Sequence, residues 1–380
     1  MILIIIIYIA LILLNGLACY YKMRVKTIEW LSFLLLLFLM GGNTFNDDYE
    51  DYFRWYETQN SPILMEPAYD YVSSLFFTFG FGFEGFRFII YLLSLAMMWV
   101  AIKRLVDNFH LILLGYLTYC FVIDTIQIRN IIAMSILMLA ITFLAEGKKL
   151  VFVIATILAS LFHYSFFLFL PLVFYDKAID LINKNMLVII CLPILMCVIF
   201  TLDNYFASQL SMIIGLLWAD SKSVYVDLRS SNFVYLVFPY LFFFIAYQTR
   251  SFLSMIEEVS DEQQQVYSNY SDIILFASVF FVFLSPILIL SQDSLRIVRD
   301  LNVELLLAVT IFYTMYKQLN ADHYEKIKEC IGNKEIIYIV SLSLLLVLWM
   351  AGGQNWHGYT DIFDNNLFLD MEMFADEIPN

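Results

Sequence analysis

Long apolar runs recur along most of the chain and restrict its possible folds more than any other feature of the sequence. Runs such as 2–20, 86–105 and 128–146 approach the roughly 20 residues that a helix needs to cross the hydrocarbon core of a bilayer. They are continuous and do not alternate with polar residues, which excludes a membrane β-barrel. We therefore predict an all-α fold, that of a polytopic integral membrane protein.

The composition supports this class and excludes others. Apolar residues make up 62% of the sequence and charged residues 15%, which excludes a soluble enzyme and a disordered protein. The 35 acidic residues outnumber the 21 basic ones, so we expect no nucleic-acid partner, because nucleic acids are bound by basic surfaces. The composition instead indicates a protein that lies in a lipid bilayer.

Hydropathy predicts about 12 transmembrane helices. Their approximate ranges are 2–20, 27–42, 86–105, 109–126, 128–146, 149–162, 164–180, 186–203, 233–250, 270–290, 301–317 and 336–352. The stretch 149–175 allows two interpretations, one long helix or a tight pair that breaks near His163. No linker or repeat interrupts the series, so we expect a single transmembrane domain, 1–353, followed by an acidic C-terminal tail, 354–380.

Basic residues orient the predicted spans. Lys22, Arg24 and Lys26 follow the first span, which places its C-terminal end in the cytoplasm. With a tight pair at 149–175, the cytoplasmic loops hold 14 of the 21 basic residues, whereas a single helix would put Lys177 and Lys184 outside. We therefore prefer the pair. The polar segments 43–85 and 204–232 and the tail are then extracytoplasmic.

Lysine predominates in the predicted cytoplasmic loops and arginine outside them. The inner loops hold 11 Lys and 3 Arg, and the outer segments hold 6 Arg and 1 Lys. Arginine outside opposes the usual distribution of positive charge. Its planar guanidinium suits bidentate recognition of phosphate or carboxylate. The alternative is that these arginines pair with acidic residues on the same side.

The first outer loop combines carboxylates with aromatic side chains. It contains Asn46-Asp47-Asp48-Tyr49-Glu50-Asp51-Tyr52, then Arg54-Trp55-Tyr56, and later Glu66-Pro67-Ala68-Tyr69-Asp70-Tyr71. Aromatic faces stack on sugar rings, and carboxylates accept hydrogen bonds from sugar hydroxyls. We therefore interpret 43–71 as a carbohydrate-binding loop. The alternative is a solvated acidic loop, although such loops are usually poor in aromatic residues.

Two further candidates lie within apolar sequence. Arg129 follows Asp124 and Gln127 at the junction of two predicted spans, where no long loop fits. An ionisable residue at membrane depth is costly and is a functional candidate by default. The alternative is an arginine that snorkels to the surface and pairs with Asp124. His163 lies inside a long apolar run and could be a base, a hydrogen-bond donor or a packing residue.

A late segment carries Arg296 and Arg299, three residues apart. If the segment is helical, both lie on one face and could form a clamp for an anion. Asp293 and Asp300 are the alternative partners that would neutralise them.

Several other patterns predict no function. The GxGxxG at 80–85 lacks a surrounding βαβ unit, so its glycines are interpreted as a break before the third span. The five cysteines are scattered and there is no HExxH, which predicts neither a disulfide framework nor a metal site. A divalent metal at the acidic run 47–51 is an alternative to simple solvation of that run. No nucleotide-binding motif is present, and we expect no cofactor.

Five short motifs, taken in order, make the sequence similar to a known family. They are Asn46-Asp47-Asp48-Tyr49, Glu66-Pro67-Ala68-Tyr69, Gln127-Ile128-Arg129-Asn130 with Ala133, Phe162-His163-Tyr164-Ser165, and the late Arg296. In this order they resemble the EpsG branch of the Wzy-type polysaccharide polymerases. The similarity covers residues 40–175 well and the remainder by topology. Ala68 is a departure, because the family usually has glycine there.

The resemblance implies a glycosyltransferase that uses no nucleotide sugar. Such polymerases join oligosaccharide repeat units carried on undecaprenyl pyrophosphate and release undecaprenyl pyrophosphate. They are multi-pass proteins of the bacterial cytoplasmic membrane, with the active site on the outer face. The products are capsule, exopolysaccharide or O-antigen. Chain-length regulators and flippases are further expected partners.

Candidate roles follow from these motifs. The catalytic candidates, which would assist the acceptor hydroxyl, are His163, Glu66 and Asp48. The candidates for binding pyrophosphate are Arg129, Arg296 and Arg299. The substrate-binding candidates are Asn46, Asp47, Tyr49, Tyr69, Gln127 and Asn130.

Three other functions stay open at this point. A polysaccharide ligase would move finished polymer to another acceptor by related chemistry. A transporter or flippase of lipid-linked sugars would be expected to have matching halves with broken helices, and the sequence has no such symmetry. A non-catalytic partner of the assembly machinery would tolerate loss of Arg129 and His163.

Overall fold

The computed structural model describes residues 2–21, 23–46, 48–59, 66–202, 233–256, 262–288 and 295–318, together with residues 341, 344, 362–363 and 365–366. These residues are helical apart from short connections, and the extended pairing among them is an isolated bridge between Asn43 and Asn366. The predicted all-α class is therefore confirmed. The predicted loop 204–232 lies outside the described residues, as do most of the span 336–352 and most of the tail.

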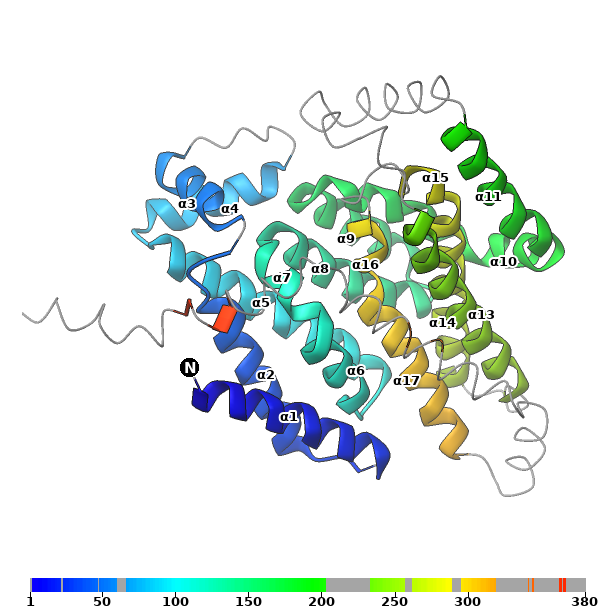
Figure 1. The fold of residues 1–380 in the computed structure, drawn as a ribbon, viewed down its shortest axis with the longest axis horizontal. Coiled ribbons are helices and arrows are strands. Elements are labelled where there is room, and N and C mark those ends of the chain that lie inside the picture. Colours follow the sequence, from blue (N-terminus) through cyan, green and yellow to red (C-terminus); the bar gives the residue numbers. More distant parts are fainter. Residues whose placement is uncertain are drawn as a thin grey trace, which may run out of the picture. The chain divides into compact units, whose positions relative to one another are not determined.

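Internal contacts divide the chain into two compact units, and each is described by itself. The first comprises Met1–Leu170 with Leu346–Asn380, and the second Pro171–Leu345. The helices of the first unit are α1 (Ile2–Tyr20), α2 (Lys26–Gly41), α3 (Tyr49–Thr58), α4 (Pro67–Thr78), α5 (Phe83–Leu105), α6 (His110–Gly115), α7 (Phe121–Ile126), α8 (Ile128–Ala145) and α9 (Lys149–Phe162) (Figure 1). A π-helical segment, Tyr116–Cys120, joins α6 to α7 in one apolar stretch.

The helices of the second unit are α10 (Tyr175–Lys184), α11 (Met186–Leu202), α13 (Val237–Ile256), α14 (Glu262–Phe283), α15 (Ser285–Leu288), α16 (Leu295–Arg299) and α17 (Asn302–Gln318). A 3₁₀ helix, Tyr164–Phe174, leads into α10. Helices α13, α14 and α17 pack against one another, and Arg250 of α13 forms an ion pair with Asp272 of α14.

Four helical segments among the described residues are long and apolar enough to cross a bilayer: α1, α5, α8 and the Gln263–Phe283 part of α14. The segments Tyr164–Lys184 and Met186–Ile199 form a fifth candidate if taken together, although they meet at 88°. His110–Ile126 and Lys149–Phe162 are apolar but shorter. These apolar helices indicate a membrane protein, and the number of about 12 spans stays a prediction.

The chain around residues 149–185 agrees with the interpretation as a pair that breaks near His163. Helix α9 ends at His163, whose backbone is extended (φ −150°, ψ 114°), as the tight-pair interpretation requires. The segment that follows the 3₁₀ helix is itself helical and forms α10. Tyr175, Ile179 and Ile182 recur every three to four residues and make the segment amphipathic, a pattern that the polar composition concealed.

The outer loop predicted at 43–85 folds into two short helices, α3 and α4, which pack against each other (Figure 1). The buried residues of α3 are Tyr52 and Tyr56, four residues apart, and those of α4 are Tyr69 and Ser73, also four apart. Gly80 adopts a left-handed φ of 79° in the turn before α5. Gly80 and Gly82 therefore lie in a break between α4 and α5, as predicted, whereas Gly85 belongs to the first turn of α5.

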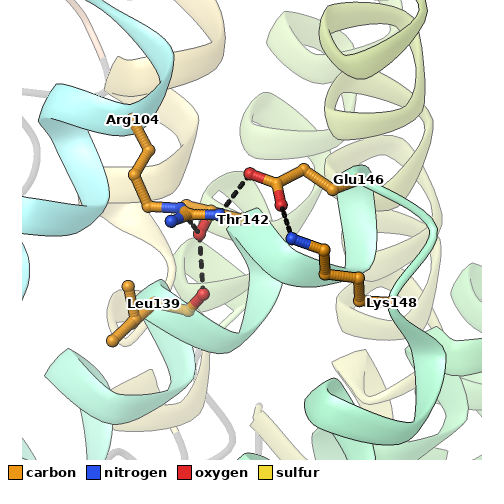
Figure 2. A network of polar contacts seen from close by, with 5 residues as sticks. All are labelled: Arg104, Leu139, Thr142, Glu146 and Lys148. Atoms are coloured by element: carbon orange, nitrogen blue, oxygen red, sulfur yellow. Dashed lines mark hydrogen bonds and ion pairs between the residues drawn. The ribbon is translucent and has the colours of Figure 1, made fainter.

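Helix α8 is central to the first unit. It packs on both α5 and α9, and its side chains are buried on nearly every face. At its C-terminal end, Glu146 accepts hydrogen bonds from Arg104 of α5 and from Lys148, the latter at 2.7 Å (Figure 2). Arg104 also donates to Thr142 at 3.1 Å. Cations at a helix C-terminus complement its dipole, so this network stabilises one end of the α5–α8 pair.

A buried polar network joins α1 to α2 and α6. Asn15 Nδ2 donates to Ser32 Oγ at 2.9 Å, and Asn15 Oδ1 lies 2.8 Å from His110 Nδ1. His110 Nε2 accepts from the backbone N–H of Val25 at 3.0 Å, so its Nδ1 carries the proton and donates to Asn15. Asn15, Ser32 and His110 are fully buried. Because an unpartnered buried polar group is costly, these bonds determine how α1 packs on its neighbours.

Replacing Asn15 with alanine should destabilise the protein. The change leaves the buried Nδ1 donor of His110 and the buried acceptor oxygen of Ser32 without their partner, which we expect to cost about 1–3 kcal/mol and to lower the melting temperature in detergent. Asn185→Ala is a matched control, because Asn185 is exposed and its side chain bonds only locally, to the carbonyl of Leu181. Its effect should stay within about 0.5 kcal/mol. Equal melting temperatures for the two variants would contradict this role of Asn15.

Candidate functional site

Glu66 connects two segments that lie far from it in the sequence. Its side chain is 4% exposed, and its Oε2 accepts a hydrogen bond from Arg129 Nη1. Its Oε1 lies 2.7 Å from His163 Nδ1 and 3.4 Å from the backbone nitrogen of Tyr164. The structure therefore brings together two of the three catalytic candidates and one of the three pyrophosphate-binding candidates.

All three residues of this cluster lie at the ends of helices. Glu66 precedes Pro67, which disfavours a helical conformation for the preceding residue and is well suited to the first turn, so α4 begins after Glu66. Arg129 is the second residue of α8, directly after a helix break at Gln127. His163 is the extended residue that ends α9. Convergence of these three helix ends forms the site.

Burial of Arg129 is unfavourable unless its charge is compensated. Its side chain is only 15% exposed, and a cation at a helix N-terminus opposes the helix dipole. Glu66 supplies the opposite charge. The rings of Tyr52 and Trp55 lie 5.1 and 5.7 Å from the guanidinium carbon, which adds cation–π attraction. The guanidinium is thus held in a set position by groups from α3 and from the start of α4.

Tyr52 is a second polar partner of Arg129. Its hydroxyl accepts a hydrogen bond from Arg129 Nε at 2.8 Å, and its ring contacts Tyr69 at a centroid distance of 6.0 Å. Burial raises the pKa of Tyr52 and of Tyr69, so both phenols stay protonated at neutral pH. Arg129 thus uses Nε for Tyr52 and Nη1 for Glu66, while its Nη2 donates to no described residue.

The predicted residue Asn46 lies in the turn that precedes α3, and Tyr49 is the first residue of that helix. Asn46 Nδ2 donates to Asn43 Oδ1 at 2.7 Å, and Asn46 Oδ1 accepts from the backbone N–H of Asp48 at 3.1 Å. Tyr49 donates to Glu84 at 2.7 Å. Asn43 also accepts a hydrogen bond from Arg87 through its carbonyl oxygen. Asn46 therefore stabilises a turn, and its amide is used inside the protein.

The negative charge of Asp48 lies close enough to Tyr52 to raise the pKa of the Tyr52 phenol. This effect is smaller than that of burial. Asp47 lies outside the described residues. Within the described part of the chain, no group of three or more His, Cys, Asp or Glu side chains could hold a metal ion.

The predicted residues Gln127 and Asn130 lie beside Arg129 at the start of α8, and both are buried. Asp124 was the alternative partner expected for Arg129, and this expectation is wrong. Asp124 instead accepts a hydrogen bond from Tyr116 at 2.7 Å. The reason is local, because the π-helical segment presents Tyr116 to Asp124, while the break at Gln127 separates Asp124 from the helix that carries Arg129.

Arg296 and Arg299 belong to α16 in the second unit. The segment is helical, so the two residues share one face, as the clamp hypothesis requires. The side chain of Arg296 lies outside the described part, and Arg299 is partly buried. Their proposed role stays a prediction.

Two residues of the first unit were not singled out from the sequence. Tyr52 is one aromatic residue among many in the outer loop, and only its spacing of four residues from Tyr56 marks it as inward-facing. Arg87 is 3% exposed and lies in the second turn of α5, so it is an ionisable residue inside an apolar span. That signal is the same one that identified Arg129.

Comparison with known proteins identifies one family. The family model described as "EpsG family" matches residues 27–360, which is most of the chain. Searches of curated proteins and of solved structures give no match. The matched range includes Glu66, Arg129 and His163 and thus the whole cluster.

Tyr52→Phe should weaken the site without disturbing its packing. The variant keeps the ring but removes the oxygen that accepts from Arg129 Nε, leaving a largely buried donor unpartnered. We expect a loss of about 1–3 kcal/mol in stability, measured by thermal unfolding in detergent. Tyr21→Phe is the control, because Tyr21 is 64% exposed at the end of α1. If both variants melt like the wild type, the Tyr52 hydroxyl is not important for holding Arg129.

Proposed function

Since the chain belongs to the EpsG family, we propose that it is a polymerase that joins oligosaccharide repeat units into a surface polysaccharide. The repeat units are carried on undecaprenyl pyrophosphate, which is released at the outer face of the cytoplasmic membrane. The observation that carries the proposal is the buried cluster in which Glu66 holds Arg129 and His163 together. The cluster supports the proposal because it combines a cation with a group that can accept a proton.

A transfer of this kind breaks one bond and forms another at the same carbon. The anomeric carbon of the donor glycan loses its bond to a pyrophosphate oxygen and forms a bond to a hydroxyl oxygen of the acceptor unit. The pyrophosphate leaves with the electron pair of the broken bond, and the hydroxyl proton goes to a base. The site must therefore place a proton acceptor and an anion-binding group close together.

His163 is the proposed base. An ionised carboxylate only accepts hydrogen bonds, so His163 Nδ1 donates to Glu66 Oε1 and the basic nitrogen of the ring is Nε2. Carboxylates orient catalytic histidines in the same manner in serine hydrolases. Glu66 is then a positioning residue, because its two oxygens bond to His163 and Arg129.

Arg129 is proposed to bind the leaving pyrophosphate. Its Nε and Nη1 are held by Tyr52 and Glu66, so Nη2 is the nitrogen that we assign to the pyrophosphate. A cation whose position is set in advance stabilises the charge that develops on a leaving group. Arg296 and Arg299 stay candidates for the same anion, and the aromatic residues of α3 and α4 are the proposed sugar-binding surface.

The size of lipid-linked glycans tests the proposal. Cells that lack the protein should accumulate single repeat units, and the wild-type gene should restore a ladder of longer chains on a gel. Arg129→Lys keeps the charge but loses the planar set of donors, and His163→Gln removes the base. We expect each to reduce chain growth by about 100-fold or more at normal membrane levels.

Arg104→Lys is the matched control, because Arg104 lies at the far end of α8 from Arg129. It should give a normal ladder. Long polymer that persists on its carrier in the deletion strain would indicate a ligase. Absence of any outer-face repeat units would indicate a transporter. A normal ladder from both Arg129→Lys and His163→Gln would remove the cluster from the mechanism.

A further inference from the structure

We propose that Arg87 is a second anion-binding residue, which holds the other phosphoryl group of the pyrophosphate that Arg129 contacts. This inference rests on the proposed function, because it concerns the same lipid-linked donor. It assigns the two guanidinium groups of one compact unit to one diphosphate.

The charge of Arg87 is buried and is not compensated by an ion pair with any described residue. The residue is 3% exposed, and its Nη1 donates to the backbone carbonyl of Asn43. Within the described part of the chain, no carboxylate forms an ion pair with it, in contrast to Arg129, Arg104 and Arg250. A buried charge is costly unless it is paired, so the position favours an anionic partner.

One nitrogen of Arg87 is available for that partner. Its Nη2 is buried and has no hydrogen-bond partner among the described residues. The aromatic rings of Tyr49, Phe83 and Tyr91 lie 5.0, 5.7 and 5.6 Å from the guanidinium carbon. These rings support the cation through their faces but cannot replace an acceptor in its plane. The Tyr91 hydroxyl also lies near the guanidinium, but it donates to the carbonyl of Thr125 and forms no hydrogen bond with Nη2. The geometry therefore leaves one in-plane donor to be satisfied.

Arg87 and Arg129 each contact tyrosines of the first unit. Tyr52 accepts from Arg129 and contacts Tyr69, while Tyr91 lies against Arg87. Burial is the main cause of the raised pKa of Tyr69, and the positive charges of both Arg129 and Arg87 oppose it. Both guanidinium groups therefore lie within electrostatic reach of the same phenol. The helices that carry them, α5 and α8, pack directly against each other.

A diphosphate matches two arginines better than a monophosphate does, because each phosphoryl group can accept hydrogen bonds from a separate guanidinium. The second cation also increases the stabilisation of negative charge as the glycan leaves. Arg87 would at the same time hold Asn43 through Nη1. Through these two contacts, Arg87 would link the turn before α3, which contains Asn43, to the bound pyrophosphate.

The test compares binding of two soluble probes, farnesyl pyrophosphate and farnesyl monophosphate, to the full-length protein in detergent. Arg87→Lys keeps the charge and one donor for the Asn43 carbonyl but lacks the second nitrogen. We expect it to weaken pyrophosphate binding by about tenfold or more, as for loss of one charge-assisted hydrogen bond, and to change monophosphate binding little. Arg104→Lys, on the same helix, should bind both probes like the wild type.

The outcomes separate this inference from the proposed function. If Arg87→Lys binds both probes like the wild type, the inference is overturned. The role of Arg87 would then be to hold the Asn43 carbonyl, and a buried water would satisfy its Nη2. Equal weakening for both probes with a lowered melting temperature would also overturn it. Arg87→Gln repeats the comparison without the charge, in case the lysine variant does not fold. A wild-type protein that binds neither probe would contradict the donor assigned under the proposed function as well.

Discussion

The buried carboxylate of Glu66 is the interaction on which the candidate site depends. It compensates the charge of Arg129, which burial and the N-terminal dipole of α8 would otherwise make unfavourable, and it fixes the ring of His163. Removing Arg129 would leave the buried charge of Glu66 uncompensated. Removing Glu66 would leave the charge of Arg129 uncompensated and the Nδ1 donor of His163 without its acceptor. The three helix ends that carry these residues are therefore held together by the same contacts that set the geometry of the site.

The central helix α8 makes such precision possible. It is buried on nearly every face between α5 and α9, so its N-terminal residues cannot shift without repacking its neighbours. Its far end is tied to α5 through Arg104 and Glu146. Helices α3 and α4 then cover the start of α8 from the outer segment. The groups that hold Arg129 thus come from the polar segment around α3 and α4, and the rigidity comes from a buried apolar helix.

Part of the site could be predicted from the sequence, and particular residues explain why. Arg129 and His163 interrupt apolar runs, so the free-energy cost of burying them marked both as functional candidates. Glu66 was one of many outer-loop carboxylates, and only the fold distinguished it from Asp48. Asp124 is the acidic residue nearest to Arg129 in the sequence, but the π-helical segment places Tyr116 where its hydroxyl donates to Asp124. Arg87 lies within an apolar span and carried the same signal as Arg129, yet its missing counter-charge is visible only in three dimensions.

The sequence by itself determined the all-helical class, the membrane character, the break at His163 and the family. These properties depend on local composition, on periodicity and on short motifs, all of which can be read along one dimension. The tertiary structure decided which carboxylate meets Arg129 and which tyrosine supports it. Such pairings join residues 63 to 97 positions apart. Many acidic residues could make them equally well on chemical grounds, and only the packing of helix ends selects one.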